Sequence, residues 1–306
     1  MEILIATLLT IITAATPLLY AALGELITEK SGVLNLGVEG MMLVGAVCGF
    51  AAVHYTQSAS FGVLVGAGAG ALLALVFAAL VLGFQASQVA TGLALTIFGV
   101  GLSALIGKDL VGIAYEGLPK LVVPVLSDIP VIGPLLFQHD ILVYGSLCLV
   151  PLLAWFLSHS RAGLVLRAVG DSPDAAHAMG YSVIRIRLLA ILFGGAMSGI
   201  GGAYLSLAYS PMWVENMSAG RGWIALALVV FATWRSGRVL LGAYLFGGIS
   251  ILQLHAQAIG VDIPSQVMSM LPYLVTIIVL VLISQDQSKI KRHAPASIGK
   301  PFHPST

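Results

Sequence analysis

Long apolar runs separated by short polar intervals dominate the chain. A membrane-spanning helix needs about 20 predominantly apolar residues. Five runs meet this length plainly: residues 3–23, 61–83, 89–107, 188–208 and 239–259. Segments 34–54 and 141–158 predict two more spans, the first one if Asn35 and Glu39 are tolerated near its end.

Two further apolar segments are weaker. Segment 222–234 is short and lies between Arg221 and Arg235, and segment 271–284 is long enough only if it begins near residue 263. We expect one of them to be a broken or tilted helix. The pattern therefore predicts an all-α polytopic membrane protein with about nine spans, within a range of eight to ten.

Composition agrees with this prediction. The 306 residues are 58% hydrophobic and 9% charged, against roughly 25% charged in a soluble domain. The net charge of +1 gives no reason to expect a nucleic-acid partner, and Cys48 and Cys148 lie in apolar segments and do not indicate a redox compartment. The first apolar run follows no basic stretch, so it is predicted to be a span rather than a signal peptide.

Lysine and arginine indicate the orientation, because cytoplasmic loops carry an excess of both. Eleven of the 14 basic residues fall in four intervals: 24–32, 159–187, 235–238 and the tail from 285. Placing these intervals in the cytoplasm puts the N-terminus outside and the C-terminus inside. Residues 1–284 then form the transmembrane domain, and 285–306 a polar, basic tail that we expect to be disordered and near anionic lipid.

Loop 108–140 is long and falls on the external side. It contains Pro119, Pro124, Pro130 and Pro134 with hydrophobic residues between them, which predicts a structured cap or a short re-entrant piece. Glu215 and Arg221, assigned to the next external loop, are candidates for meeting charges on an external partner, or for pairing with each other.

The polar interval RAVGDSPDAAHAMGY, residues 167–181, stands out among the apolar runs. Ser172 is placed to cap a helix that begins at Pro173, Asp174 suits its first turn, and Gly180 is suited to end it. A short helix with small alanine side chains fits a groove on a partner. The alternative is an ordinary capped loop helix.

This interval and the following IRIRLLAILFGGAMSGIGGAYLSL resemble the cytoplasmic coupling loop and next span of ABC-importer permeases of the branched-chain amino acid, ribose and nucleoside class. EKSGVLNLGVEGMMLVGAVCG (29–49) and QVATGLALTIFGVGLSALIG (88–107) are similar to the nucleoside and simple-sugar members. The resemblance implies a type II-like ABC importer permease fold in the cytoplasmic membrane of a bacterium.

The resemblance also implies partners and a contact site. Loop 159–187 would bind an ABC ATPase subunit that carries ATP and magnesium, with no cofactor in this chain. The other implied partners are a second permease subunit, related or identical, an external solute-binding protein and membrane lipid. The residues expected to couple to the ATPase are Arg167, Gly170, Asp171, Pro173, Ala175, Ala176 and Gly180.

Asn35 and Glu39 lie one helical turn apart at the start of an apolar segment. A carboxylate there is costly without a partner or a wet cavity, which by default is a hypothesis of a functional site. The alternative is that the two side chains brace a helix start, with Lys30 as a partner. The resemblance places this segment near an intracellular gate, which favours bracing.

Uncharged polar side chains are spaced along the segment 85–103. They suit the passage of a neutral polyol or nucleoside because they exchange hydrogen bonds without trapping a solute. Hydrogen bonding between helices is the alternative. Aromatic rings suited to stacking on a base or sugar accompany them, with an aromatic belt at the external interface as the alternative for those near that side. The expected pathway residues are Gln88, Thr91, Thr96, Phe98, Ser103 and Tyr204.

Glycine is abundant, with 35 residues. The small-xxx-small pairs Gly66/Gly70 and Gly195/Gly199 predict close helix packing.

No phosphate-binding loop is present: the stretch from Gly101 to Lys108 has one residue too many. The chain is therefore expected not to hydrolyse ATP, and not to be an enzyme. We also expect no paired carboxylates inside the membrane, so that an external energy source is the economical assumption; a secondary carrier is the nearest alternative. An intramembrane hydrolase using Ser198 and His255 is the alternative from a different class.

For the substrate, the GVLNLGVEG segment favours nucleosides, then simple sugars such as ribose, then branched-chain amino acids.

Overall fold

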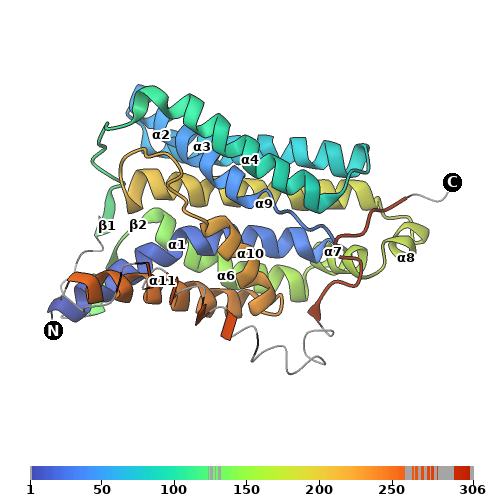
Figure 1. Ribbon diagram of the computed structural model, residues 1–306. Coiled ribbons are helices and arrows are strands. Elements are labelled where there is room, and N and C mark those ends of the chain that lie inside the picture. The colour runs from blue at the N-terminus through green and yellow to red at the C-terminus, as the bar shows by residue number, and fades with distance from the viewer. Residues whose placement is uncertain are drawn as a thin grey trace.

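The computed structural model describes residues 2–122, 132–258 and 293–303, together with scattered positions within 124–129 and 264–281. Its long helices lie roughly side by side, and the two ends of the chain lie at opposite ends of the bundle (Figure 1). We call these the α8 end and the β-sheet end, after the elements found there. The elements are α1 (Glu2–Lys30), α2 (Val38–Thr56), α3 (Ala59–Ala78), η1 (Ala79–Gly83), α4 (Gln88–Gly107), η2 (Lys108–Leu110), β1 (Lys120–Val122), α5 (Ile132–Phe137), β2 (Gln138–Asp140), α6 (Ile141–His159), α7 (Arg161–Asp171), α8 (Pro173–Ala178), α9 (Val183–Tyr204), η3 (Leu205–Tyr209), α10 (Arg221–Phe231) and α11 (Ser236–Ala258).

Seven helical stretches among the described residues are long and apolar enough to cross a membrane. They are Leu4–Lys30, Val38–Thr56, Ala59–Gly83, Gln88–Leu110, Ile141–His159, Val183–Tyr209 and Ser236–Gln257. All seven spans expected from the stronger apolar runs are thus found. The expected ninth span, 271–284, falls largely outside the described residues, so the count of about nine stays approximate.

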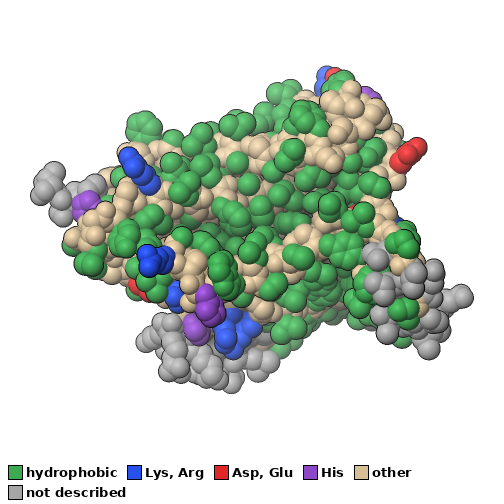
Figure 2. Space-filling model, turned by 180° about the vertical axis from the view of Figure 1, so that it is seen from behind, with side chains coloured by type: hydrophobic (Ala, Val, Ile, Leu, Met, Phe, Trp, Pro, Cys, Tyr) green, Lys and Arg blue, Asp and Glu red, His purple; other side chains and the backbone are tan. Residues whose placement is uncertain are grey.

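Hydrophobic side chains cover the flank of the bundle, and charged side chains gather toward its two ends (Figure 2). Such a surface suits lipid around the middle and water at both ends. The distribution explains how a chain with so few charged residues forms a stable surface.

α10 is the weak segment expected at 222–234, and it is a half-helix of 11 residues. Residues 210–220 run from the end of α9 at the β-sheet end toward the middle of the bundle, where α10 begins (Figure 1). The backbone turns sharply after α10, at Thr233 and Trp234 with φ of 49° and 53°. A broken helix of this kind is tolerated because its ends are buried in protein rather than in lipid.

The two glycine pairs singled out in the sequence pack against each other where α3 crosses α9. A Cβ on Gly199 would lie 2.2 Å from the carbonyl oxygen of Gly66, and one on Gly70 would lie 2.2 Å from that of Gly195. Side chains at these positions would separate the helices, which confirms the prediction of close packing.

Loop 108–140 is structured where it is described. β1 and β2 pair antiparallel, with Lys120 opposite Asp140. Asp140 then caps α6, since its Oδ1 accepts hydrogen bonds from the backbone N–H groups of Leu142 and Val143 at 2.9 and 3.1 Å. These residues are structured, as expected, and the external position of the loop stays a prediction.

Candidate coupling surface and buried polar sites

α7 and α8 form a compact helical corner at the α8 end. Ser160 Oγ accepts a hydrogen bond from Gly163 N at 2.9 Å and caps α7. α8 begins at Pro173 as predicted, and Gly180, with φ of +86°, follows its end. The Ser172 side chain makes no capping hydrogen bond, so the proline alone marks the start of this helix.

α8 presents one face outward and one inward. Asp174, Ala175, His177 and Ala178 are exposed. Ala176 is 5% exposed and packs in a small apolar cluster with Val169, Val183 and Phe302. The two alanines expected to act together therefore lie in different places: Ala175 faces out, and Ala176 holds the helix in place.

Two apolar side chains after α8 extend its outward face. Met179 is 78% exposed and Tyr181 is 45% exposed. Sequence reasoning missed both, although a methionine and a tyrosine within a polar interval were a usable signal. Together with Ala175 they make up what we call the α8 surface.

Gly170 fixes α7 against the end of α1. A Cβ at this position would lie 2.1 Å from the carbonyl oxygen of Lys30, so that a larger residue would push the two helices apart. Asp171 is exposed beside it. Arg167 does not belong to the α8 surface but lines a pocket with Lys30.

The segment 293–303 is packed against the α8 end, whereas the tail was expected to be disordered. The Ser297 backbone N–H and hydroxyl both donate to the carbonyl oxygen of Gly170, at 2.9 and 2.6 Å. Gly299 N donates to the carbonyl of Gly32, and the Phe302 ring lies 5.6 Å from that of His177. Polar composition suggested disorder, but these bonds use backbone groups that any sequence carries. Residues 285–292 lie outside the described part of the chain.

Arg187 is the centre of this contact, and it is 1% exposed. Its guanidinium donates to the carbonyl oxygens of Ser31 and Lys300 and to Ser297 Oγ, at 3.1 to 3.2 Å. One buried cation on α9 thus joins the α1–α2 loop to the segment 293–303.

Two acidic residues near the end of α1 are buried, although interval 24–32 was expected to be a cytoplasmic loop. α1 continues to Lys30. Glu25 Oε1 accepts from Asn35 N at 3.0 Å, and Glu29 Oε2 accepts from the Trp234 indole at 2.5 Å. The expectation that the spans hold no paired carboxylates was wrong, because a charged helix end resembles a loop in sequence.

Glu39 binds the start of α10 rather than Lys30. Its Oε1 accepts from Ser218 Oγ at 2.6 Å and Gly220 N at 2.8 Å, and its Oε2 accepts from Gly222 N at 2.5 Å. Asn35 lies in the turn before α2, where its Oδ1 accepts from Gly37 N at 2.9 Å. Both residues brace helix starts, and the helix that Glu39 braces is far away in the sequence.

Arg221, the first residue of α10, stays close to its own backbone and to an aromatic ring. Its guanidinium donates to the carbonyls of Met217 and Ser218, each at 3.2 Å, and lies 5.1 Å from the centre of the Tyr209 ring. Glu215 is exposed in the preceding segment.

The expected pathway residues do not converge on one site. Gln88 bonds Leu34 N at 2.8 Å and Lys300 O at 3.5 Å, and Thr96 donates to Leu36 O at 2.9 Å. Ser103 donates to Val100 O at 2.9 Å within its own helix. Their polar groups serve contacts inside the subunit, and their role in transport stays a prediction.

The other three pathway residues differ from one another in exposure. Thr91 is 7% exposed, and Tyr204 is fully buried, with its hydroxyl 3.1 Å from Asp140 Oδ2. Phe98 is 55% exposed on α4, so it is the member of the set that a molecule outside this subunit is able to contact.

Ser198 and His255 are engaged elsewhere. Ser198 Oγ donates to Gly194 O at 2.8 Å. The His255 ring nitrogens bond Thr7 Oγ1 at 3.3 Å and Ile251 O at 3.1 Å. The nucleophile and base of the hydrolase alternative are therefore not brought together. Within the described ranges, no three His, Cys, Asp or Glu side chains are grouped to hold a metal ion.

A family profile described as the permease component of the branched-chain amino acid transport system matches residues 7–280. The chain belongs to this permease family. As a family member it is a multi-pass permease subunit of an ABC transporter, and permeases of this family work with an ATPase and a binding protein.

Three curated relatives of this permease match it over most of both chains. A putative glucose ABC transporter permease of Haloferax volcanii is 43% identical over 88% of each chain. A nucleoside ABC transporter permease of Lactococcus lactis is 33% identical over 92% of each chain. A guanosine ABC transporter permease of Bacillus subtilis is also 33% identical, over 90% of the permease and 92% of the relative. No solved structure matches the permease.

Proposed function

We propose that this chain is the permease subunit of a binding-protein-dependent importer of a nucleoside, and that a separate ATPase subunit docks on the α8 surface. The observation that carries the docking site is the exposed Met179 at the end of a rigid small helix. An exposed thioether beside exposed alanine offers apolar area without bulk, which suits a groove on a partner.

The proposed orientation in the membrane rests on the positions of lysine and arginine. The cations at the α8 end include Lys30, Arg161, Arg185 and Arg235, whereas Lys108 and Lys120 lie toward the β-sheet end. The positive-inside rule then puts the α8 end in the cytoplasm, with the N-terminus outside. ATP and magnesium bind to the ATPase subunit, and the β-sheet end receives the solute-binding protein.

Motion of the docked ATPases reaches the spans through three rigid joints. α7 is fixed to α1 by the close approach at Gly170, α8 is held by buried Ala176, and α9 is fixed by buried Arg187. A push on α8 therefore moves α1 and α9 rather than bending a slack loop. Arg167, Asp171 and Pro173 belong to this corner as supporting residues.

The docking site is tested with the reconstituted importer. Met179→Asp places a charge in the apolar contact, so we expect uptake to fall at least about tenfold and the ATPase to be lost on purification. Tyr55→Asp is the matched control for ATPase association, because Tyr55 is 77% exposed on α2 and belongs to the other end of the bundle. Normal uptake and normal ATPase association in Met179→Asp would show that the α8 surface is not the docking site.

The nucleoside proposal draws on the two relatives named for nucleoside or guanosine transport. A simple sugar is the second candidate, because the relative named as a putative glucose permease has the higher identity. We place the solute route along α4, which borders it together with a second permease subunit. The exposed ring of Phe98 is the side chain there suited to stack on a base.

Uptake measurements separate the two substrates. Labelled guanosine and glucose are offered to the complete importer, and Phe98→Ala is compared with Leu93→Ala, whose side chain is 42% exposed on the same helix. We expect guanosine uptake, with a KM raised about threefold to tenfold by Phe98→Ala alone, since a stacking contact contributes about 1 kcal/mol. Glucose uptake without guanosine uptake would select the sugar candidate.

A further inference from the structure

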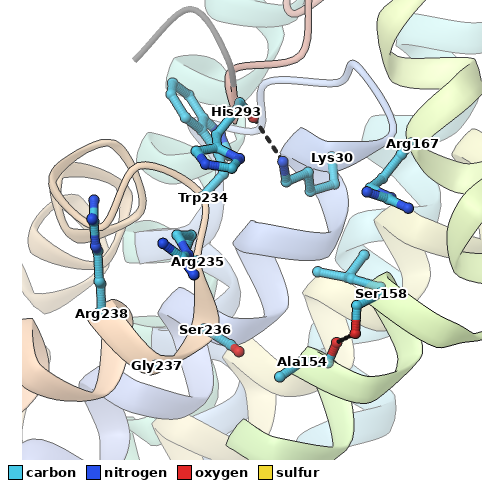
Figure 3. A pocket seen from close by; sticks show the side chains of 11 residues that line it. Lys30, Ala154, Ser158, Arg167, Trp234, Arg235, Ser236, Gly237, Arg238 and His293 are labelled. Carbon is cyan, nitrogen blue, oxygen red and sulfur yellow. Dashed lines mark hydrogen bonds between the residues drawn. The ribbon is translucent and has the colours of Figure 1, made fainter. Parts of the chain in front are cut away.

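A pocket of about 580 Å³ at the α8 end is lined by basic side chains from four separate parts of the chain (Figure 3). Lys30 ends α1, Arg167 belongs to α7, and Arg235 and Arg238 surround the start of α11. His293 adds an imidazole from the segment 293–303. No acidic side chain lines this pocket among the described residues.

One nitrogen atom of a cationic side chain in the pocket lacks a hydrogen-bond partner. Arg167 Nε is buried and has no hydrogen-bond partner. Buried polar groups are normally satisfied, and a buried donor of a charged group left without an acceptor is costly. The Lys30 ammonium, on a side chain only 9% exposed, donates to the carbonyl oxygen of His293 at 2.7 Å.

Neighbouring carboxylates do not fill the pocket. Glu29 is 1% exposed, accepts a hydrogen bond from the indole of Trp234 and does not line the pocket. Asp171, on α7, is near enough to act on the charge of Lys30 but does not line the pocket. Arg238 donates to Thr233 Oγ1 at 2.6 Å, which is a neutral acceptor. Among the described residues, the side chains that line the pocket therefore carry a net positive charge.

The start of α11 also faces the pocket, through Ser236 and Gly237. The first N–H groups of a helix and its dipole favour an anion. Ala154 and Leu157, from the end of α6, also line the pocket and supply an apolar surface. A phosphate with an apolar part attached fits this combination of basic and apolar side chains.

We propose that this pocket binds a phosphate group, carried by an anionic lipid headgroup or present as a free phosphate. Arginine and lysine clusters between membrane helices at the basic side of a membrane protein suit phosphate oxygens, arginine through paired N–H donors. The bound phosphate accepts a hydrogen bond from the Arg167 side chain and offsets the repulsion among the four cations. It also ties α7 to α1 and α11.

The test uses the full-length permease with Arg235→Gln and Arg238→Gln combined. The matched control is Arg161→Gln with Arg185→Gln, which removes two exposed arginines of the same end that do not line the pocket. Binding of a labelled phosphatidylglycerol is measured in phosphatidylcholine nanodiscs, and inorganic phosphate is titrated against the detergent-purified protein while the midpoint of thermal unfolding is followed.

Each basic side chain near an anionic surface raises affinity about fivefold. We therefore expect the pocket variant to lose about 25-fold in affinity for the probe that binds, and the control variant to lose less than about threefold. Loss of phosphatidylglycerol binding alone identifies a lipid site. A phosphate-dependent rise in the unfolding midpoint, absent in the pocket variant, identifies a free phosphate.

Two results would overturn the proposal. One is equal loss in the pocket and control variants, which would mean general surface attraction. The other is binding of neither probe to the wild-type protein. If the double variant fails to fold, Arg235→Gln alone replaces it, because Arg235 is exposed, and a loss of about fivefold is expected.

Discussion

Glu39 allows a quantitative prediction, because one carboxylate serves three donors at the start of α10. The donors are Ser218 Oγ, Gly220 N and Gly222 N. Glu39→Leu leaves all three without their acceptor, at about 1–3 kcal/mol for each buried donor. Leucine also removes a buried carboxylate, whose desolvation opposes folding. Because that carboxylate is already fully hydrogen-bonded, we expect the loss of the three bonds to dominate.

Glu39→Gln separates charge from shape. The amide keeps one oxygen for Ser218 and Gly220 but turns an N–H₂ group toward Gly222 N, so about one of the three bonds is lost. The expected order of stability is wild type, then Gln, then Leu. With about 2 °C per kcal/mol for a chain of this size, one lost bond lowers the unfolding midpoint by about 2–6 °C for Gln, and three lost bonds lower it by about 6 °C or more for Leu.

The assay is thermal unfolding of the purified protein in one detergent, with hydrogen exchange of residues 218–224 as a local reading. Glu215→Gln is the control, since Glu215 is exposed in the same segment. A Glu39→Leu protein that unfolds within about 1 °C of wild type, or above Glu39→Gln, would refute the reasoning.

Two further predictions concern contacts between distant segments: one tests helix packing and the other tests hydrogen bonds. Gly199→Ala puts a Cβ 2.2 Å from the carbonyl oxygen of Gly66, so we expect overpacking to lower the free energy of unfolding by about 1–3 kcal/mol. The control Gly68→Ala faces open space and should leave the unfolding midpoint unchanged or raise it. Equal midpoints in the two variants would contradict the observed helix approach. Ser297→Ala removes the hydrogen bonds of the hydroxyl with Gly170 and Arg187, so hydrogen exchange of residues 293–303 should accelerate roughly fivefold to tenfold, which corresponds to about 1 kcal/mol. The control Lys300→Gln keeps the backbone carbonyl that Arg187 binds and should leave the exchange rate unchanged. The same exchange rate in both variants would count against the contact.

The sequence carried enough information to predict the spans, the short helix at Pro173 and the close approach of glycines, because each depends on residues near one another in the chain. It could not identify the partner of Glu39, which lies about 180 residues away. A buried carboxylate indicates that hydrogen-bond donors lie beside it, but the hydrophobic periodicity of the sequence does not identify those donors.

The predictions of a loop at the end of α1 and of disorder in the segment 293–303 were wrong for a related reason. Glu25 and Glu29 gave the end of α1 the composition of a loop, yet both are buried. Residues 293–303 are polar but bind largely through backbone groups and Ser297. The composition of a segment reflects the average preference of its residues for water. It does not show that the fold places one acceptor, such as the carbonyl oxygen of Gly170, within reach of that segment.

The buried position of Arg187 has a consequence for the order of events during synthesis. Its partner Ser297 is made 110 residues later, after α9, α10 and α11 have been synthesised. Until then the guanidinium lacks two of its three hydrogen-bond partners, Ser297 and Lys300, and the corner formed by α7 and α8 is held on one side only. An ATPase subunit that docks on this corner before residue 297 is in place would meet a surface whose support is incomplete. The final contacts of the permease thus set the earliest time at which a finished docking surface exists.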